Sequence, residues 1–180
     1  MNNDIARVLI SEEQLQKRIR EMGAEIALDY AGKNPTMVCI LKGAVMFYTD
    51  LLRSIPVPLT MDFMAVSSYG NRTKSSGEVE IRKDLSTSIE NKHVIIVEDI
   101  VDSGFTLSYL TRMLASRGAA SIRLATLLDK PSRRAPGITL TADYSGFEIG
   151  NEFVVGYGLD YAEQYRNLPY IGILKPEIYE

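Results

Sequence analysis

Cysteine is almost missing from this sequence, because Cys39 is the only one among 180 residues. An intrachain disulfide is therefore excluded. Since Cys39 lies within the apolar run MVCIL, we expect a small buried side chain and not a reactive thiol. Histidine is equally scarce, and the single one, His93, stands at the start of a strand-like segment, where we assign it no catalytic role.

Long apolar runs and a strong charge of one sign are also missing. No apolar segment approaches the ~18 residues that a membrane helix needs, and the start, MNNDIARVLISEEQ, lacks the basic and apolar parts of a signal peptide. The formal net charge is −3, which offers no general attraction to nucleic acid or to an acidic membrane surface. We therefore expect a cytoplasmic protein that binds neither nucleic acid nor membranes.

The apolar pattern that is present predicts one α/β domain. A capping box at Ser11 opens a helix whose apolar residues, from Leu15 to Tyr30, recur at three- and four-residue spacing. We expect further helices over 44–55 and 106–118, and strands over 36–41, 59–67, 93–99, 121–129, 152–160 and 170–174. Apolar strands that alternate with helices indicate a mainly parallel sheet with helices on both faces. No repeat or linker suggests a second independent domain, so we expect residues 1–180 to form one domain with a small appended subdomain.

The segment 68–86 allows two interpretations. Its first half is polar, rich in glycine and serine, and carries Arg72 and Lys74. It is either a solvated hairpin loop or a mobile lid that closes over a reactive ligand. Composition alone favours the hairpin.

The stretch VIIVEDIVDSGFTL, residues 94–107, places three acids and a short polar loop directly after an apolar strand. In open α/β sheets, ligands bind beyond the carboxyl ends of the strands, which is where Glu98 and Asp99 stand. The first N–H groups of the following helix form an anion site, and Gly104 lets the backbone approach a ligand closely. The residues that we expect at this turn are Asp102, Ser103, Gly104 and Thr106.

Such a site suits a ligand that carries both a phosphate and hydroxyl groups. The loop has neither the Gly-Lys-Ser/Thr ending of a Walker loop nor the dinucleotide fingerprint. A ribose 5-phosphate fits, with its hydroxyls against Glu98 and Asp99. A pyrophosphate on the sugar would also require Mg²⁺, which favours oxygen ligands and substrate phosphates. The alternative, that the two acids only favour the positive end of the helix, is weaker because three acids accompany the glycine and the hydroxyl residues.

The same stretch resembles the phosphoribosyl-pyrophosphate signature of the type I phosphoribosyltransferases. The match covers the four apolar residues, all three acids, the glycine and the threonine, while Phe105 stands at a position that varies in the family. The resemblance implies an α/β fold with a hood from the N- and C-terminal segments, ligand contacts that include Phe105, and metal binding at Glu98 and Asp99. We expect Asp102 to be the general base, because a carboxylate at the start of the loop can take the ring proton that an attacking purine must lose.

Two further segments resemble the hypoxanthine-guanine subfamily. CILKGAVMFYTDLLR is similar to the segment whose peptide can be cis and whose backbone holds pyrophosphate, which implies this role for Lys42 and Gly43. Without the resemblance, an ordinary glycine turn with a solvated lysine would be the simpler interpretation. SSYG resembles the start of the family's lid, which implies a lid over about 67–84 with Ser68 and Tyr69 closing over the pyrophosphate.

The base-binding segments follow from the same resemblance. TLLDKPSRR is similar to the segment whose lysine contacts the 6-oxo group of the purine, which points to Lys130, since an ammonium donates to an oxo group and not to an amino group. EFVVGYGLDYAEQYRNLPYIGIL is similar to the closing segment. There Phe153 would stack on the purine and the Val154 backbone would read the base edge. Asp160 would help to bind a second metal ion, and Arg166 would contact pyrophosphate. Taken alone, the lysine would be solvated and the Phe-Val-Val run would be core strand.

Together, these resemblances imply an enzyme of purine salvage. It would transfer 5-phosphoribosyl from phosphoribosyl pyrophosphate to the 6-oxopurines hypoxanthine or guanine, with Mg²⁺, and would assemble as a homodimer or homotetramer. A xanthine-preferring phosphoribosyltransferase is the nearest alternative, because nothing in the sequence fixes how the 2-position of the base is read. A second alternative is a regulatory protein of the same fold that binds RNA or DNA and uses the sugar-phosphate site as a nucleotide sensor. Such proteins usually have a basic face or an added helix-turn-helix, and the charge of −3 does not favour a basic face.

Overall fold

The computed structural model describes residues 1–68 and 79–179. Its centre is a six-stranded sheet with the strand order β4-β3-β2-β5-β6-β7. The strands are β2 (Thr36–Leu41), β3 (Thr60–Ser68), β4 (Val79–Lys83), β5 (His93–Val101), β6 (Ser121–Asp129) and β7 (Tyr144–Glu148). All neighbouring pairs are parallel except β3 and β4, which run antiparallel. The predicted α/β fold with a mainly parallel sheet is confirmed.

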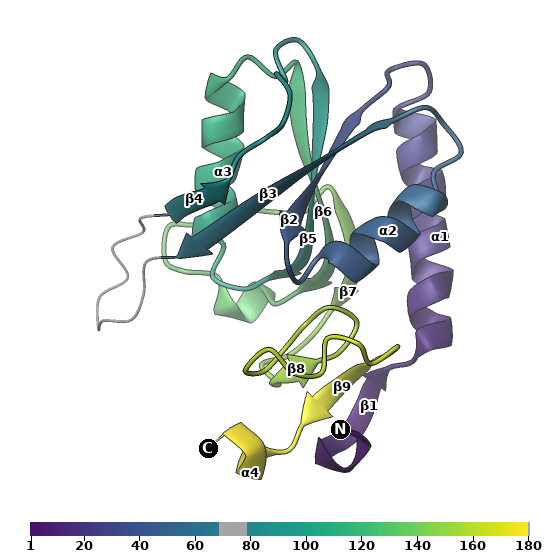
Figure 1. The fold of residues 1–180 in the computed structure, drawn as a ribbon, viewed down its shortest axis with the longest axis vertical. Helices are drawn as coiled ribbons and strands as arrows, with labels where there is room; N and C mark the ends of the chain where they lie inside the picture. The colour runs from purple at the N-terminus through teal and green to yellow at the C-terminus, as the bar shows by residue number, and fades with distance from the viewer. Residues whose placement is uncertain (69–78, 180) are drawn as a thin grey trace.

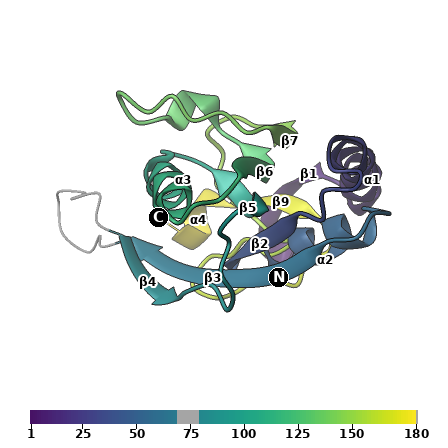
Figure 2. The same ribbon diagram turned by 90° about the horizontal axis from the view of Figure 1, so that it is seen from above.

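Helices cover both faces of this sheet (Figures 1 and 2). The helices are α1 (Glu12–Asp29), α2 (Val45–Arg53), α3 (Phe105–Ser116) and the short α4 (Pro176–Tyr179), with 3-10 helices η1 (Asn2–Asp4) and η2 (Pro131–Arg133). Successive residues of β5 point to opposite faces and supply both cores. Ile95 and Val97 lie in the core beneath α1 and α2, whereas Val94 and Ile96 lie in the core beneath α3. This double burial is the reason that the strand is apolar throughout.

The predicted capping box opens α1. The Gln14 N–H donates to Ser11 Oγ at 3.2 Å, and the Ser11 N–H donates to Gln14 Oε1 at 2.8 Å. Leu15, Ile19 and Met22 are fully buried, which confirms the predicted apolar face of this helix. Across 1–68 and 79–179, none of the helices has both the length and the apolar character that crossing a membrane requires.

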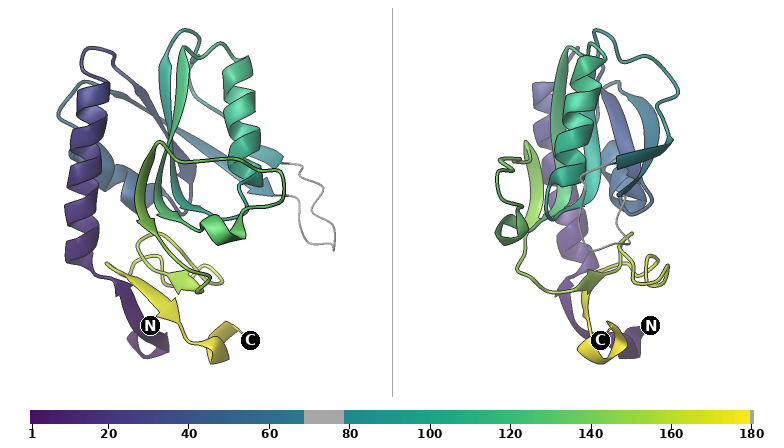
Figure 3. Two further views of the ribbon diagram at one scale, coloured as in Figure 1. Left: turned by 180° about the vertical axis from the view of Figure 1, so that it is seen from behind. Right: turned by 90° about the vertical axis from the view of Figure 1, so that its left-hand side faces the viewer.

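A second sheet of three strands is built from the two ends of the chain (Figures 1 and 3). Its strands, in spatial order, are β1 (Ile5–Ile10), β9 (Ile171–Leu174) and β8 (Val154–Val155). Both neighbouring pairs are antiparallel. Tyr165 and Leu168, from the connection between β8 and β9, pack with Val155 and Leu174 in a small separate core. The N- and C-terminal segments therefore form one unit at the end of the molecule where both termini lie.

The structure differs from the sequence predictions at several strand boundaries. β5 continues past the predicted end at residue 99, so Glu98 and Asp99 lie within the strand. The strand predicted over 152–160 is reduced to the two residues of β8, because positive φ angles at Gly156 (99°) and Tyr157 (50°) turn the chain. The sequence does not predict β1, β4 and β7, which are short and mostly exposed or half-buried.

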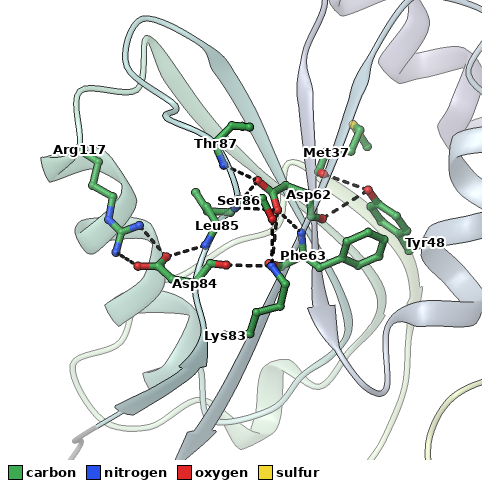
Figure 4. A network of polar contacts seen from close by, with 10 residues as sticks. All are labelled: Met37, Tyr48, Asp62, Phe63, Lys83, Asp84, Leu85, Ser86, Thr87 and Arg117. Atoms are coloured by element: carbon green, nitrogen blue, oxygen red, sulfur yellow. Dashed lines mark hydrogen bonds and ion pairs between the residues drawn. The ribbon is translucent and has the colours of Figure 1, made fainter.

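A network of polar contacts holds the connection between β4 and β5 against β3 (Figure 4). Asp62 on β3 is only 3% exposed, and its carboxylate accepts hydrogen bonds from the Phe63 N–H at 2.8 Å and the Ser86 N–H at 2.9 Å. The Thr87 N–H donates to it at 3.3 Å, and Lys83 adds an ion pair at 3.8 Å. Burial alone raises the pKa of Asp62, but the hydrogen bonds outweigh it, so the pKa lies below its ordinary value.

Candidate functional site

A cavity of about 340 Å³ opens at the carboxyl ends of β2 and β5. Its lining combines the turn after β2, the end of β5, the start of α3 and part of the connection between β8 and β9. The predicted site residues that line it are Gly43, Glu98, Asp99, Asp102, Ser103, Gly104, Thr106, Asp160 and Arg166. Segments that are far apart in the sequence therefore meet where parallel strands end, which is the position expected for a ligand site in such a sheet.

The loop between β5 and α3 depends on Gly104. This residue precedes α3 with a φ of 81°, a left-handed conformation that glycine adopts without strain. A Cβ at this position would also lie 2.8 Å from Ile138 Cγ2. No side chain in the described part of the chain caps the first turn of α3, whose N–H groups have no partner within the helix. Together with the helix dipole, these N–H groups favour an anion.

Glu98 and Asp99 are adjacent, partly buried carboxylates at the other side of this loop. Glu98 Oε1 accepts a hydrogen bond from the Asp99 N–H at 3.1 Å, and Asp99 Oδ1 accepts one from the Ile100 N–H at 2.7 Å. Burial, and then the negative charge of Asp99, raises the pKa of Glu98 well above its ordinary value. Burial also raises the pKa of Asp99, although hydrogen bonds and the nearby Arg166 partly offset this effect. A cation, or hydroxyl groups that donate to these oxygens, would relieve both carboxylates.

Gly43 lies directly against this acidic pair. A Cβ at Gly43 would overlap the Asp99 carboxylate, so any side chain there would displace it. Gly158, with a φ of 102°, packs equally closely on the Gly43 carbonyl from the connection between β8 and β9. The peptide between Leu41 and Lys42 is cis, as the resemblance implies. The turn after β2 is therefore held between the acidic pair and the C-terminal segment.

Arg166 joins the C-terminal segment to the cavity. Its guanidinium donates to the Gly158 carbonyl at 2.7 Å and pairs with Asp160 at 2.9 Å. Its Nε is buried and has no hydrogen-bond partner within the described part of the chain. Lys42 lies outside the cavity lining, is 69% exposed and pairs with Glu163 at 3.1 Å. Contacts with Lys42, and then with Arg166, lower the pKa of Glu163, so one acid lies between the two cations predicted to hold pyrophosphate.

The residues predicted to bind the base lie outside the cavity lining. Lys130 is 9% exposed, and its ammonium group donates to the Glu152 carbonyl at 2.7 Å. Burial lowers the pKa of Lys130. Phe153 is 37% exposed, and its ring stacks on that of Tyr179 with centroids 4.7 Å apart. Val154 is buried in β8.

Three remaining predicted residues are described only in part or lie apart from the cavity. Phe105 is the first residue of α3, is 40% exposed and does not line the cavity. Ser68 ends β3, and only its backbone is described. Tyr69 lies outside the described residues, as does most of the predicted lid over 67–84.

A divalent metal ion at this cavity would take part of its ligands from a substrate. Among the residues that the structure describes, no group of three or more His, Cys, Asp or Glu side chains is arranged to hold a metal ion. The carboxylates of Glu98, Asp99 and Asp160 nevertheless line one cavity and are hard oxygen ligands. Mg²⁺ is commonly held by one or two carboxylates together with substrate phosphates, and this set of donors fits that arrangement.

Two arginines that the sequence analysis did not single out contact the loop after β5. Arg133 pairs with the Asp102 carboxylate at 3.0 Å, and Arg134 donates to the Asp102 carbonyl at 2.7 Å. Both belong to the segment TLLDKPSRR, in which only Lys130 is predicted to bind a ligand. The signal in the sequence is a pair of adjacent arginines shortly after a predicted strand.

Comparison with known proteins agrees with this geometry. Residues 10–162 match the family model of the phosphoribosyl transferase domain. A hypoxanthine-guanine phosphoribosyltransferase of Bacillus subtilis (strain 168) is 57% identical over 180 residues, which cover 100% of this chain and 99% of that protein. A bifunctional protein TilS/HprT of Listeria innocua is 62% identical over 179 residues, or 99% of this chain. The chain spans only 27% of the length of that bifunctional relative.

The fold leads to the same family. A crystal structure of a hypoxanthine phosphoribosyltransferase from Staphylococcus aureus matches with a TM-score of 0.96 at 53% sequence identity. The match covers 100% of this chain and 97% of that chain. The resemblance found in the sequence is thus confirmed over nearly the whole length, and the chain belongs to the phosphoribosyl transferase domain family.

Proposed function

We propose that this protein transfers the 5-phosphoribosyl group of phosphoribosyl pyrophosphate to hypoxanthine or guanine, which yields IMP or GMP and pyrophosphate for purine salvage. The observation that carries the proposal is the cavity at the ends of β2 and β5. It combines a helix start that favours an anion, an acidic pair with raised pKa values and an arginine from the C-terminal segment. Two relatives that the chain covers over 98% or more of their length are named hypoxanthine-guanine phosphoribosyltransferase, which supports the choice of bases.

The sugar phosphate occupies the end of β5 in this proposal. Its 5-phosphate accepts hydrogen bonds from the first N–H groups of α3, beginning at Phe105, and from the hydroxyls of Ser103 and Thr106. The ribose hydroxyls donate to Glu98 and Asp99. Burial raises the pKa values of both carboxyl groups, and hydrogen bonds from the hydroxyls would stabilise their charged forms.

The pyrophosphate lies along the turn after β2. The backbone of Lys42 and Gly43 holds it, and the side chains of Lys42 and Arg166 supply positive charge. In the described structure these cations pair with Glu163 and Asp160, and they exchange these acids for pyrophosphate oxygens when the substrate binds. Ser68 and Tyr69 complete the enclosure in this proposal, as the family resemblance implies.

The purine lies against the segment that follows β6 and the start of β8. Lys130 already donates one hydrogen to the Glu152 carbonyl, which orients the ammonium group and leaves two hydrogens for a 6-oxo group. Phe153 stacks on the base, and the Val154 backbone reads its edge. The 6-amino group of adenine cannot accept a hydrogen bond from the Lys130 ammonium group, so adenine is a poor substrate.

Glu98 and Asp99 would hold Mg²⁺, with Asp160 for a second ion, and the bound metal would neutralise charge on the pyrophosphate. The chain itself supplies the remaining chemistry. As the anomeric bond breaks, negative charge grows on the pyrophosphate, which Arg166 and Lys42 stabilise. Asp102 lies at the start of the phosphate loop and takes the ring proton of the attacking purine.

Three further features belong to the same proposal. Residues 1–180 act as a single domain, with the three-stranded sheet as a hood and a lid over about 67–84. The lid excludes water, which would otherwise hydrolyse the positively charged sugar. The active form is a homodimer or a homotetramer.

The test is a panel of hypoxanthine, guanine, xanthine and adenine with phosphoribosyl pyrophosphate, with and without Mg²⁺, followed by pyrophosphate release. We expect turnover with hypoxanthine and guanine, little with adenine, and loss of turnover without Mg²⁺. A preference for xanthine would select the xanthine-specific alternative. No pyrophosphate with any purine, together with tight nucleic-acid binding, would select the regulatory sensor.

A further inference from the structure

Arg134 is a mostly buried cation that follows η2 and does not line the cavity. Its side chain is 14% exposed. Its Nη1 donates to the Asp102 carbonyl at 2.7 Å and to the Val101 carbonyl at 3.0 Å. The Lys130 carbonyl accepts from the same nitrogen at 3.3 Å. One side chain therefore contacts both the start of the phosphate loop and the residue proposed to select the base.

The other nitrogens of Arg134 fix the orientation of its guanidinium. Nη2 pairs with the Asp129 carboxylate at the end of β6, and Nε donates to the Leu140 carbonyl at 3.3 Å. Asp129 balances the charge, so the guanidinium is both buried and neutralised. A guanidinium presents its N–H groups in a rigid planar fork, which an ammonium group cannot reproduce at several acceptors at once.

Arg134 fixes the Asp102 carbonyl in the loop, whereas the Val101 carbonyl, at the end of β5, also accepts a hydrogen bond from the Lys130 N–H at 3.0 Å. In a trans peptide, the carbonyl and the following N–H point in opposite directions. Since the Asp102 carbonyl points to the guanidinium of Arg134, the Ser103 N–H of the same peptide points the opposite way. Carbonyl oxygens repel an anion and N–H groups attract it, so this orientation suits a bound phosphate. The Ala135 N–H donates to the Ser103 carbonyl at 3.0 Å, so the segment after η2 also fixes the next peptide of the loop.

We propose that Arg134 is a positioning residue that fixes the Asp102–Ser103 peptide and Lys130 relative to one another. The inference rests on the proposed function, in which Asp102 takes a proton from the base and Lys130 selects a 6-oxopurine. Without the planar guanidinium, Asp102 and Lys130 are still present, but their positions relative to one another are no longer fixed. Phosphate binding and base selection then deteriorate together, although Arg134 touches neither ligand.

The experiment compares Arg134→Lys with the matched control Arg18→Lys. Arg18 lies on α1, is 25% exposed, and its guanidinium also donates to a backbone carbonyl, that of Ser145 at 2.8 Å, and to the carboxylate of Glu25 at 2.9 Å. Three quantities are measured for each variant: the thermal midpoint, the kcat/KM for hypoxanthine and for adenine, and the affinity for ribose 5-phosphate by calorimetry.

For Arg134→Lys we expect kcat/KM for hypoxanthine to fall by about tenfold to a hundredfold, with a smaller preference for hypoxanthine over adenine and weaker ribose 5-phosphate binding. Arg18→Lys should retain all three values at a comparable thermal midpoint. An unchanged base preference and unchanged ribose 5-phosphate affinity in Arg134→Lys would overturn the inference, because a merely structural role predicts that result.

A second variant covers the case in which Arg134→Lys does not fold. Asp129→Asn removes the charge that orients the guanidinium, and it should shift base preference and ribose 5-phosphate affinity in the same direction by a smaller factor. Wild-type values in Asp129→Asn would then overturn the inference. Failure of the wild-type protein to release pyrophosphate with any purine would contradict the proposed function, whereas the ribose 5-phosphate measurements would still decide the role of Arg134 in the loop.

Discussion

Two groups of buried or partly buried acids on the same sheet differ in how the fold treats their charge. Asp62 on β3 accepts hydrogen bonds from three backbone N–H groups, and its pKa is lowered (Figure 4). Glu98 and Asp99 on β5 each accept one hydrogen bond from the next N–H, and burial raises both pKa values. The Asp62 carboxylate, which joins parts of the fold, therefore has three N–H donors, whereas the Glu98 and Asp99 carboxylates, which line the cavity, have one each. Such unsatisfied acids are expected where a ligand completes the site.

The largest effect is expected at Asp102, an acid that lines the same cavity as Glu98 and Asp99 and pairs with Arg133. Replacement by alanine, Asp102→Ala, should lower kcat by about 10²–10⁴-fold, the range for a general base, and leave binding of phosphoribosyl pyrophosphate nearly intact. Steady-state kinetics with both substrates measures the two effects separately. The control is Asp29→Ala, because Asp29 is 46% exposed and Asp102 47%, and each pairs with one arginine. Asp29 also accepts a hydrogen bond from the Tyr144 hydroxyl at 2.6 Å, so this control loses at least as many contacts. Equal losses of turnover and of sugar binding in Asp102→Ala would indicate a positioning role instead.

The opposite behaviour is expected at Asp62. The variant Asp62→Ala leaves three backbone N–H groups without their acceptor, which should lower the free energy of unfolding by about 3 kcal/mol. Urea denaturation measures this loss, and kcat of the folded fraction should stay near the wild-type value. A loss below about 1 kcal/mol would mean that water replaces the carboxylate at little cost.

Glu98→Gln should change stability in the other direction. The substitution removes a carboxyl group whose ionisation burial disfavours, so the free energy of unfolding at pH 7 should rise by an amount on the order of 1 kcal/mol, while turnover falls. Urea denaturation of Glu98→Gln, with Asp62→Asn measured in parallel for comparison, gives the sign of the change in the free energy of unfolding. If both variants were destabilised to the same extent, the distinction between the two groups of acids would fail.

The smallest effect is the pH dependence of these differences. The folded-state pKa of Glu98 is raised, so the fold carries a penalty that is full above that pKa, shrinks as the pH falls below it, and disappears below the unfolded pKa of about 4.3. The folded-state pKa of Asp62 is lowered, so its contribution is present above its unfolded pKa of about 3.9 and is lost as the pH falls further. When urea denaturation is repeated from pH 7 downward, the free energies of unfolding of Glu98→Gln and the wild type should become equal first. Asp62→Asn and the wild type should converge only at strongly acidic pH, and the reverse order would contradict the assigned directions.

The sequence reveals the second group of acids far more readily than the first. Glu98 and Asp99 follow an apolar strand and precede a Gly and Ser/Thr loop, so every part of the pattern lies within a short local stretch. Asp62 also stands in an apolar strand, but its partners Ser86 and Thr87 lie on a connection after another strand, 24 and 25 residues along the chain. No local pattern encodes such a contact.

The same limit explains what the sequence predicts of the fold and the site. The strands buried on both faces and the capped helix α1 were predictable because their periodicity is local. The short strands β1, β4 and β7 depend on partners elsewhere, and the roles of Arg133 and Arg134 depend on a loop about thirty residues earlier. Asp160 and Arg166, in the C-terminal segment, are predicted as site residues only from the family resemblance, because neither belongs to a local motif of its own.

A crystal structure with bound GMP examines the central claim most directly. We predict the phosphate at the first turn of α3, within hydrogen-bond distance of backbone N–H groups between residues 103 and 107, and the ribose hydroxyls at Glu98 and Asp99. A nucleotide bound elsewhere, with this turn free of phosphate, would contradict it.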